Sequence, residues 1–503
     1  MVVLAAGVLS VQPHPDAPGR DPGRPNIVLI MVDDLDVALL NQLAAIPRDG
    51  GAPPSLTETL GARGMTFSNA FVVDPLCCPV RASLFRGQYP HNHGVWQNGD
   101  PDGGYDAFQP LESQSLAVWL QDAGYRTGLV GKYLNDYGDD LPADAREVGV
   151  PAGWEPSSWR ALWGTASYWK FHLNAGGIVH GRSASPENYQ TTLLSTMARN
   201  IVTLDDGRPF FLLITPSAPH NGHPTDEFGA VRDSISQRPV PAPEFANLYA
   251  DVALPEPASL FETDLADKPA WVREAAADWQ TGTTRGELRD EVREQYIARL
   301  QAMASVEQMV ASLVDELGSS RLGETYIIFT SDNGWHAGEH SLPPDKRTPY
   351  EEDIRVPLII VGPGIAPGSV RDELVTNLDL TPTIMEITGA TSVVTEDGRS
   401  LLPLLAGGDI PSWRNAFLTE YEAAANDPLP SWRGLRTTEY SYVRWADGFI
   451  ELYDLRSDPG QLENIAPDEP ALVAELDATL QSRQACIGST CFVRTISGPG
   501  PDS

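Results

Sequence analysis

Short runs of consecutive apolar residues recur along this 503-residue chain, and they constrain its fold more than any other feature. The runs occupy residues 26–32, 125–130, 209–215, 325–331 and 357–361. A run that is apolar at every position is typical of a strand with both faces buried, as in a parallel sheet. Apolar residues at helical spacing lie between the runs, notably over residues 113–123 and 285–317. Strands that alternate with helices predict an α/β fold, in which helices sandwich a large, mostly parallel sheet.

The C-terminal part of the chain has a different pattern. Short alternating strands separated by turns span residues 434–455, and a helical segment follows over residues 469–483. This pattern predicts a smaller α+β subdomain, built from an antiparallel sheet and one helix. We place the boundary near Arg414, so that residues 25–413 form the large domain and residues 414–503 form the C-terminal subdomain.

The charge balance of the chain is strongly acidic. Asp and Glu number 68 against 35 Lys and Arg, which gives a formal net charge of −33. Such a chain repels nucleic acids and anionic membranes at long range, so we expect no nucleic-acid partner. An anionic substrate would need a local basic pocket. We also expect no membrane span, because no stretch approaches the roughly 20 apolar residues that cross a bilayer.

Two features of the sequence bear on the cellular compartment. Residues 1–24 combine an apolar start with a segment rich in Pro, Gly and Asp, which predicts a signal-peptide remnant or a flexible lead-in. Cys486 and Cys491 enclose a tight loop and are either a disulfide or two free thiols. A disulfide would imply an oxidising compartment. We therefore expect a secreted or periplasmic protein.

Polar residues follow four of the apolar runs. They are Asp33 and Asp34 after the first run, Lys132 after the second, His220 after the third, and Asp332 and Asn333 after the fourth. Ligands gather at the carboxyl ends of parallel strands, so these side chains should meet at one rim of the sheet. Carboxylate and amide oxygens are hard ligands that suit Ca²⁺ or Mg²⁺. A single Asp after a strand is more often a helix N-cap, but two such clusters favour a metal site.

The segment from Cys77 to Arg81, with the sequence CCPVR, is a second candidate for chemistry. Pro79 favours the first turn of a helix, which places Cys77 at the helix N-terminus. The positive end of the helix dipole favours an anion there, and Arg81 lies one turn further on. A buried cysteine pair, formed by Cys77 and Cys78, is the structural alternative.

These segments together resemble a known family. C-x-P-x-R running into ASLFRGQYPHNHGV resembles the signature of the sulfatases, and NIVLIMVDDLD resembles their first strand with its metal-binding aspartates. GKY, APH and TSDNGWHAGEHSLPPDKR resemble the remaining site segments, in family order, and ELYDLRSDPGQLENIA resembles the C-terminal subdomain. The resemblance covers residues 25–491. CCPVR, YPHNHGV, GKYLNDYG and SLPPDKR are most similar to N-acetylglucosamine-6-sulfatases and arylsulfatase-type members.

The resemblance implies how the reaction starts. A separate maturation enzyme would oxidise Cys77 to formylglycine, and the hydrated aldehyde would attack the sulfur of a sulfate monoester. Arg81 would orient the hydrated aldehyde. The implied metal cofactor is Ca²⁺, held by Asp33, Asp34, Asp332, Asn333 and the converted Cys77.

The resemblance also implies which groups bind the substrate, a sulfated small molecule or glycan such as N-acetylglucosamine 6-sulfate. Lys132 and Lys346 would bind sulfate oxygens, although Lys346 lies in a polar loop and has a surface lysine as its alternative. His220 would protonate or hydrogen-bond the leaving oxygen, with a structural histidine as the alternative. We further expect His336 to line the site.

One position departs from the family pattern. Many sulfatases carry a histidine two residues after the site lysine, assigned to deprotonating the covalent sulfate ester, but this chain has Leu134 there. The elimination base is therefore open, with His91 and His93 among the candidates.

Other interpretations remain open at the level of sequence. The chain fits an arylsulfatase of broad specificity, a phosphate or phosphonate ester hydrolase of the same superfamily, or a non-catalytic binder of sulfated glycans. A group of aromatic residues either stacks on a sugar or forms a satellite hydrophobic cluster. The group consists of Trp154, Trp159, Trp163, Tyr168 and Trp169.

Overall fold

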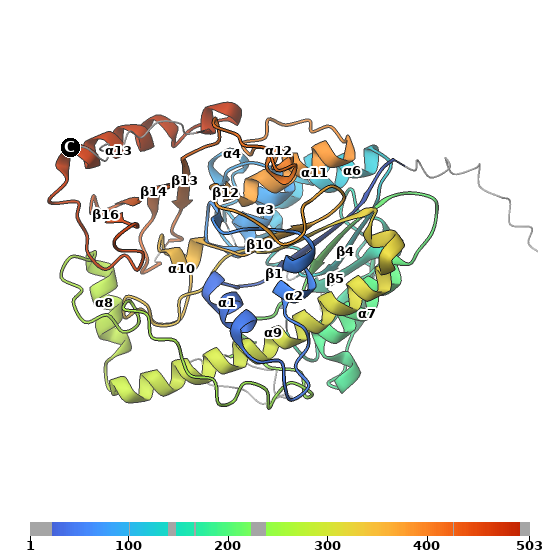
Figure 1. The fold of residues 1–503 in the computed structure, drawn as a ribbon, viewed down its shortest axis with the longest axis horizontal. Coiled ribbons are helices and arrows are strands. Elements are labelled where there is room, and N and C mark those ends of the chain that lie inside the picture. Colours follow the sequence, from blue (N-terminus) through green and yellow to red (C-terminus); the bar gives the residue numbers. More distant parts are fainter. Residues whose placement is uncertain are drawn as a thin grey trace, which may run out of the picture.

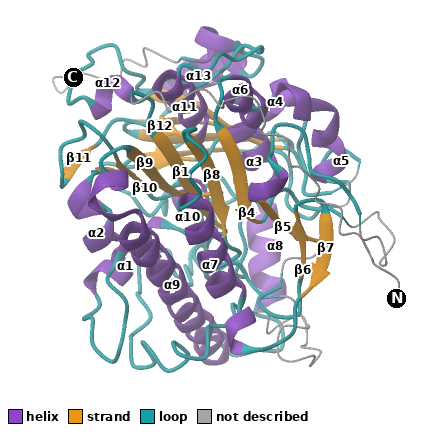
Figure 2. Ribbon diagram, turned by 90° about the vertical axis from the view of Figure 1, so that its right-hand side faces the viewer, coloured by secondary structure: helices purple, strands orange, loops and turns teal. Residues whose placement is uncertain are grey.

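The computed structural model describes residues 23–99, 101–138, 147–164, 167–222, 238–425 and 427–492. Within these residues ten strands form one sheet, and helices cover both of its faces (Figures 1 and 2). In spatial order the strands are β11 (Ser369–Arg371), β2 (Met65–Phe67), β10 (Leu358–Val361), β9 (Thr325–Ser331), β1 (Asn26–Val32), β8 (Phe210–Thr215), β4 (Arg126–Gly131), β5 (Trp159–Trp163), β6 (His172–Ala175) and β7 (Ile178–Gly181).

The five adjacent strands β9, β1, β8, β4 and β5 are parallel, which confirms the predicted α/β fold. The apolar run at residues 357–361 needs a correction. It forms β10, which pairs antiparallel with β9 and places Leu358 opposite Thr330. Because β10 is buried along its whole length like its neighbours, its composition does not reveal its direction.

Alternate residues of the central strands enter two different hydrophobic cores. In β1, Val28 and Ile30 belong to one core, and Ile27 and Leu29 belong to the other. The first core is covered by α1 (Val37–Ala45), α7 (Gln190–Val202) and α9 (Arg285–Leu322), and the second by α3 (Cys77–Arg86), α6 (Leu116–Asp122) and α11 (Leu380–Thr388). Burial on both sides explains why the strands lack polar alternation.

Helix α9 runs beneath the sheet along one face of the molecule (Figure 2). It begins after Thr284, whose hydroxyl accepts from the amide of Glu287. Its regular geometry breaks at Gly318, which has φ 60° and ψ 175°, a conformation that suits a residue without a Cβ atom. The helix predicted over residues 285–317 is therefore confirmed.

The predicted large domain contains several shorter elements besides these. They are α2 (Leu56–Thr59), α4 (Pro90–His93), α5 (Gly104–Phe108), α8 (Ala270–Trp279), α10 (Glu351–Ile354), α12 (Leu402–Leu405), and β3 (Ala70–Phe71) paired with β12 (Val375–Thr376).

An antiparallel sheet and one helix form the C-terminal end, as predicted (Figure 1, red). The elements are β13 (Ala416–Tyr421), β14 (Trp432–Thr437), β15 (Tyr440–Trp445), β16 (Ile450–Asp454) and α13 (Pro470–Arg483). Cys486 and Cys491 form a disulfide just beyond α13. The domain boundary near Arg414, two residues before β13, stays a prediction.

In the described parts of the chain, no helix combines the length and the apolar composition needed to span a bilayer.

Candidate active site

Four neighbouring strands bring the predicted polar residues to one rim of the sheet. The strands β9, β1, β8 and β4 are adjacent and parallel, so their carboxyl ends lie together. The residues delivered there are Asp33 and Asp34 after β1, Asp332 and Asn333 after β9, Lys132 after β4, and His220 in the loop after β8. The three aspartates and the asparagine are each less than 2% exposed. Water therefore screens the charges of the aspartates only weakly.

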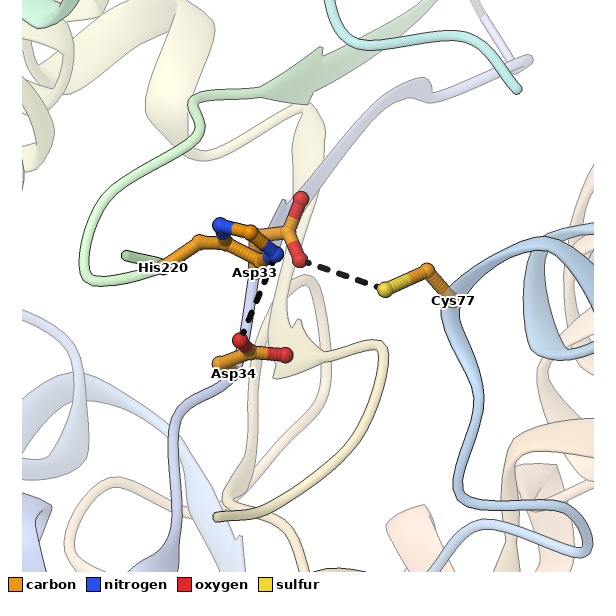
Figure 3. A group of neighbouring side chains, drawn as sticks. All are labelled: Asp33, Asp34, Cys77 and His220. Atoms are coloured by element: carbon orange, nitrogen blue, oxygen red, sulfur yellow. Dashed lines mark hydrogen bonds and ion pairs between the residues drawn. The ribbon is translucent and has the colours of Figure 1, made fainter. Parts of the chain in front are cut away.

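Cys77 enters this rim from the other side, at the first position of α3 (Figure 3). Its Sγ atom lies 3.5 Å from Oδ1 of Asp33 and 2.9 Å from Nζ of Lys346. Burial raises the pKa of the Cys77 thiol to about 12, although Lys132 and Lys346 oppose the shift. A plain thiol here is thus protonated at neutral pH and is a poor nucleophile.

Arg81 lies one turn along α3 from Cys77 and is buried against the acids. Its Nε and Nη2 atoms donate to Oδ2 of Asp332 at 3.0 and 2.8 Å, and Nη1 donates to the main-chain carbonyl of Lys132 at 3.0 Å. The guanidinium therefore connects α3 to the ends of β9 and β4. Two donors on one carboxylate oxygen fix its position more strictly than a single bond would.

Two lysines balance the buried acids. Nζ of Lys132 lies 2.7 Å from Oδ2 of Asp33, and Nζ of Lys346 contacts Oδ1 of Asp34. Burial by itself raises the pKa of both carboxyl groups, but the neighbouring cationic side chains, Lys132 foremost for Asp33 and Lys346 foremost for Asp34, hold both below the usual range. The acids raise the pKa of each lysine in turn against the effect of burial, so all four groups are charged at neutral pH.

The acidic cluster has the donor set of a hard-cation site. Single ligand atoms of Asp33, Asp34, Cys77 and His220 all lie within 4.8 Å of one another. Oδ2 of Asp34 and Oδ1 of Asn333 are buried and accept no hydrogen bond from any described residue. Buried acceptors without partners carry a free-energy cost that a cation would remove. Carboxylate and amide oxygens fit Ca²⁺, so the residues present suit the predicted ion.

His220 faces the cluster from the β8 loop (Figure 3). Its Nδ1 atom lies 2.7 Å from the carbonyl of Asn221, which can only accept, so Nδ1 carries a hydrogen. Nε2 then points to the site, 3.6 Å from Oδ2 of Asp34. The ring is 38% exposed, so a substrate can reach it from the solvent side.

His336 is anchored mainly within the protein. Its Nδ1 lies 2.9 Å from Oδ1 of Asp353 and its Nε2 lies 3.0 Å from the carbonyl of Pro343. Burial lowers the pKa of His336, but Asp353 prevails and raises it to about 9. His336 and Lys346 both line a cavity of about 210 Å³ beside Trp271. A direct contact between His336 and substrate remains a prediction.

His91 and His93, the candidates for the elimination base, are both held by contacts within the protein, and their role as a base stays a prediction. The ring of His91 contacts Glu420 and the carbonyl of Cys486, both at 3.0 Å. The ring of His93 lies 3.0 Å from Oγ of Ser83 and accepts from the amide of Val95 at 3.1 Å. Both ring nitrogens of each histidine are thus engaged in structural contacts.

Most of the aromatic group belongs to the core. Trp154, Trp159, Tyr168 and Trp169 are at most 4% exposed and pack in the two main cores. These four side chains are buried too deeply to stack on a sugar. Trp163 is half-buried and lines a separate cavity of about 470 Å³.

The structure also reveals a residue that the sequence pattern did not single out. Arg299 on α9 is buried, and its guanidinium donates to the main-chain carbonyl of Asp34. The available signal was an arginine beside Ile297 and Leu300, next to the buried face of a long amphipathic helix. Such a position usually holds an apolar residue.

The chain is similar to known proteins over most of its length. A family model described as Sulfatase matches residues 25–390, and one described as N-sulphoglucosamine sulphohydrolase, C-terminal, matches residues 338–485. An N-acetylglucosamine-6-sulfatase of Capra hircus is 34% identical over 524 residues, with 95% of this chain and 86% of the relative covered. An arylsulfatase of Volvox carteri is 32% identical, with coverage of 93% and 76%. A solved structure with its substrate D-glucosamine-2-N,6-O-disulfate superposes with a TM-score of 0.72 at 24% identity, covering 92% of this chain and 97% of that one.

The mostly parallel sheet and the charged rim at its carboxyl edge define an α/β protein with a buried site of acidic and lysine side chains. The matched family model spans most of the chain, and the chain belongs to the sulfatase family. It is accordingly a sulfuric ester hydrolase, and the resemblance found in the sequence is confirmed.

Proposed function

We propose that this enzyme removes a 6-O-sulfate from an amino sugar or a related glycan, using formylglycine at position 77 and a bound Ca²⁺. The observation that carries the proposal is the position of Cys77, whose Sγ lies between Nζ of Lys346 at 2.9 Å and Oδ1 of Asp33 at 3.5 Å. The sugar specificity is supported by the similarity to N-acetylglucosamine-6-sulfatases over nearly the whole chain.

The buried acceptors support a metal in this site. Asp33, Asp34, Asp332 and Asn333 would hold the ion. When bound, the ion would polarise the sulfate oxygens, and a hydrated formylglycine at position 77 would supply the nucleophilic oxygen. Arg81 contributes by fixing Asp332, to which it donates twice.

The cationic side chains bind the sulfate group. Lys132 and Lys346 each present a buried ammonium at the position of the reacting group, where it balances the charge that develops during sulfuryl transfer. His220 is placed to donate a proton from Nε2 to the leaving oxygen. The low exposure of the two lysines keeps water away from their charges, which strengthens their electrostatic effect.

A secreted or periplasmic location belongs to the same proposal. It is supported by the disulfide between Cys486 and Cys491, since disulfides persist in oxidising compartments. The expected partners are a sulfated glycan and the enzyme that converts Cys77. Mass spectrometry of the peptide that carries Cys77 tests the conversion directly, and Cys78→Ala is a matched control in the same motif.

A substrate panel tests the reaction class and the specificity. It compares release from N-acetylglucosamine 6-sulfate, other sulfated monosaccharides, 4-nitrophenyl sulfate and 4-nitrophenyl phosphate. We expect the 6-sulfated amino sugar to have the highest kcat/KM, and Cys77→Ala to abolish all release. Turnover of aryl sulfates alone would favour a broad arylsulfatase and refute the sugar assignment. Faster turnover of the phosphate ester would refute the reaction class.

A further inference from the structure

Arg299 connects helix α9 to the loops that form the rim. Its Nη2 atom donates to the main-chain carbonyl of Asp34, and its Nη1 atom lies 3.5 Å from the carbonyl oxygen of Pro219, the residue before His220. The side chain is 2% exposed, so these contacts are made out of water. One guanidinium therefore touches the loop after β1 and the loop after β8.

The same side chain reaches a third loop. The guanidinium carbon of Arg299 stands 5.2 Å from the ring centre of Trp335, which follows Asn333 by two residues. Nη2 is also 3.3 Å from Oδ2 of Asp36, and this ion pair balances the buried charge. A planar guanidinium can donate to several acceptors and stack on an indole at once, whereas a lysine ammonium cannot.

Asp34 has a backbone that needs such support. Its φ angle is 67°, in the left-handed region that non-glycine residues rarely adopt. Residues in this region are strained and persist only where surrounding contacts hold them. The contact from Arg299 to the Asp34 carbonyl is one of these, and the contact from Asn333 to its carboxylate, at 2.6 Å, is another.

We propose that Arg299 is a positioning residue, which holds the Asp34 carboxylate and the His220 loop in the arrangement that binds the cation and the substrate. This inference rests on the proposed function of the site. Arg299 acts from behind the rim, through main-chain carbonyls, and has no part in the chemistry itself. Its loss should loosen the cation site before it affects the rest of the fold.

Calcium titration and steady-state kinetics test this role together. We expect Arg299→Lys and Arg299→Met to weaken Ca²⁺ affinity by about 10- to 100-fold, the range seen when groups that orient metal ligands are removed. We also expect kcat to fall more than KM changes. Arg299→Lys should lose less than Arg299→Met, because an ammonium can still reach one of the carbonyls.

Glu307→Gln is the matched control. Glu307 lies about two turns further along α9, is buried, and pairs with Arg48 at 2.7 Å, away from the rim loops. This variant should lower the thermal midpoint but keep the Ca²⁺ affinity and kcat of the wild type. Equal losses of affinity in Glu307→Gln and Arg299→Lys would overturn the positioning role, since they would indicate a general loss of stability.

A second variant covers the case in which Arg299 variants do not fold. Asp36→Asn removes the charge that balances Arg299 but keeps the N-cap of α1, because Asn caps helices as well as Asp does. It should also weaken Ca²⁺ binding, and an unchanged affinity would refute the inference. If the wild type itself neither binds Ca²⁺ nor hydrolyses sulfate esters, the proposed function fails instead, which is a distinct result.

Discussion

The ammonium nitrogen of Lys346 lies 2.9 Å from the Sγ atom of Cys77, although the two residues are 269 positions apart in the chain. The same ammonium contacts the carboxylate of Asp34. Burial lowers the pKa of Lys346, but Asp34 and the other nearby acids raise it well above its ordinary value. A permanent positive charge is therefore held against the reacting position.

Lys346→Met should reduce kcat by roughly 10²–10³, the loss typical of removing one preorganised group that stabilises transition-state charge. The measurement is kcat and KM with 4-nitrophenyl sulfate, on protein whose residue 77 has been checked by mass spectrometry. Lys268→Met is the matched control, because Lys268 is also buried but pairs with Glu262 elsewhere. Wild-type kcat in Lys346→Met would contradict the role assigned to this lysine.

His220→Gln should slow the enzyme according to the leaving group. Loss of a general acid costs typically 10²–10⁴-fold when the leaving group needs a proton, and much less when it does not. We therefore expect a large loss of kcat with sugar sulfates and a small one with 4-nitrophenyl sulfate, whose phenolate leaves unprotonated. An equal loss with both substrates would argue against proton donation by Nε2.

Removal of the metal should destabilise the protein as well as stop turnover. A ligand that binds only the folded state adds about 2.7 kcal/mol at 100 times its Kd. Treatment with a calcium chelator should thus lower the thermal midpoint, and added Ca²⁺ should restore it. Asp34→Asn should make the midpoint nearly insensitive to Ca²⁺. A wild-type midpoint that does not respond to the ion would contradict the calcium site.

Stability should depend on the protonation of His336. Burial lowers its pKa, but Asp353 raises it to about 9, above the value of about 6.5 in an unfolded chain. The folded state then binds more protons between these values, so the stabilisation is complete below pH about 6.5 and is lost as pH rises to about 9. The full effect is on the order of 3 kcal/mol.

His336→Gln should therefore flatten the free energy of unfolding over this pH range, measured by denaturant titration. His93→Gln is the control, because burial lowers the pKa of His93 to about 3 and keeps its ring neutral throughout. A slope in His336→Gln equal to that of the wild type would show that another group titrates.

Local patterns were sufficient to predict the sheet and much of its rim. Asp33 and Asp332 each come directly after a strand. The residue that follows a parallel strand lies at the carboxyl edge of the sheet, so local sequence is enough to place these two at the rim. Cys77 was expected at a helix N-terminus because Pro79 suits the first turn, and α3 begins at Cys77. The antiparallel direction of β10 was missed, since burial on both faces produces the same apolar run in either direction.

The sequence by itself determined which segments become strands and helices, and which polar groups end those strands, because these properties depend on neighbours along the chain. The tertiary structure decided which distant groups meet. Lys346 reaches Cys77 from a loop with no periodic pattern, and Arg299 reaches Asp34 across 265 positions from a helix on one face of the sheet. Such contacts depend on strand order and helix packing, which local periodicity does not encode.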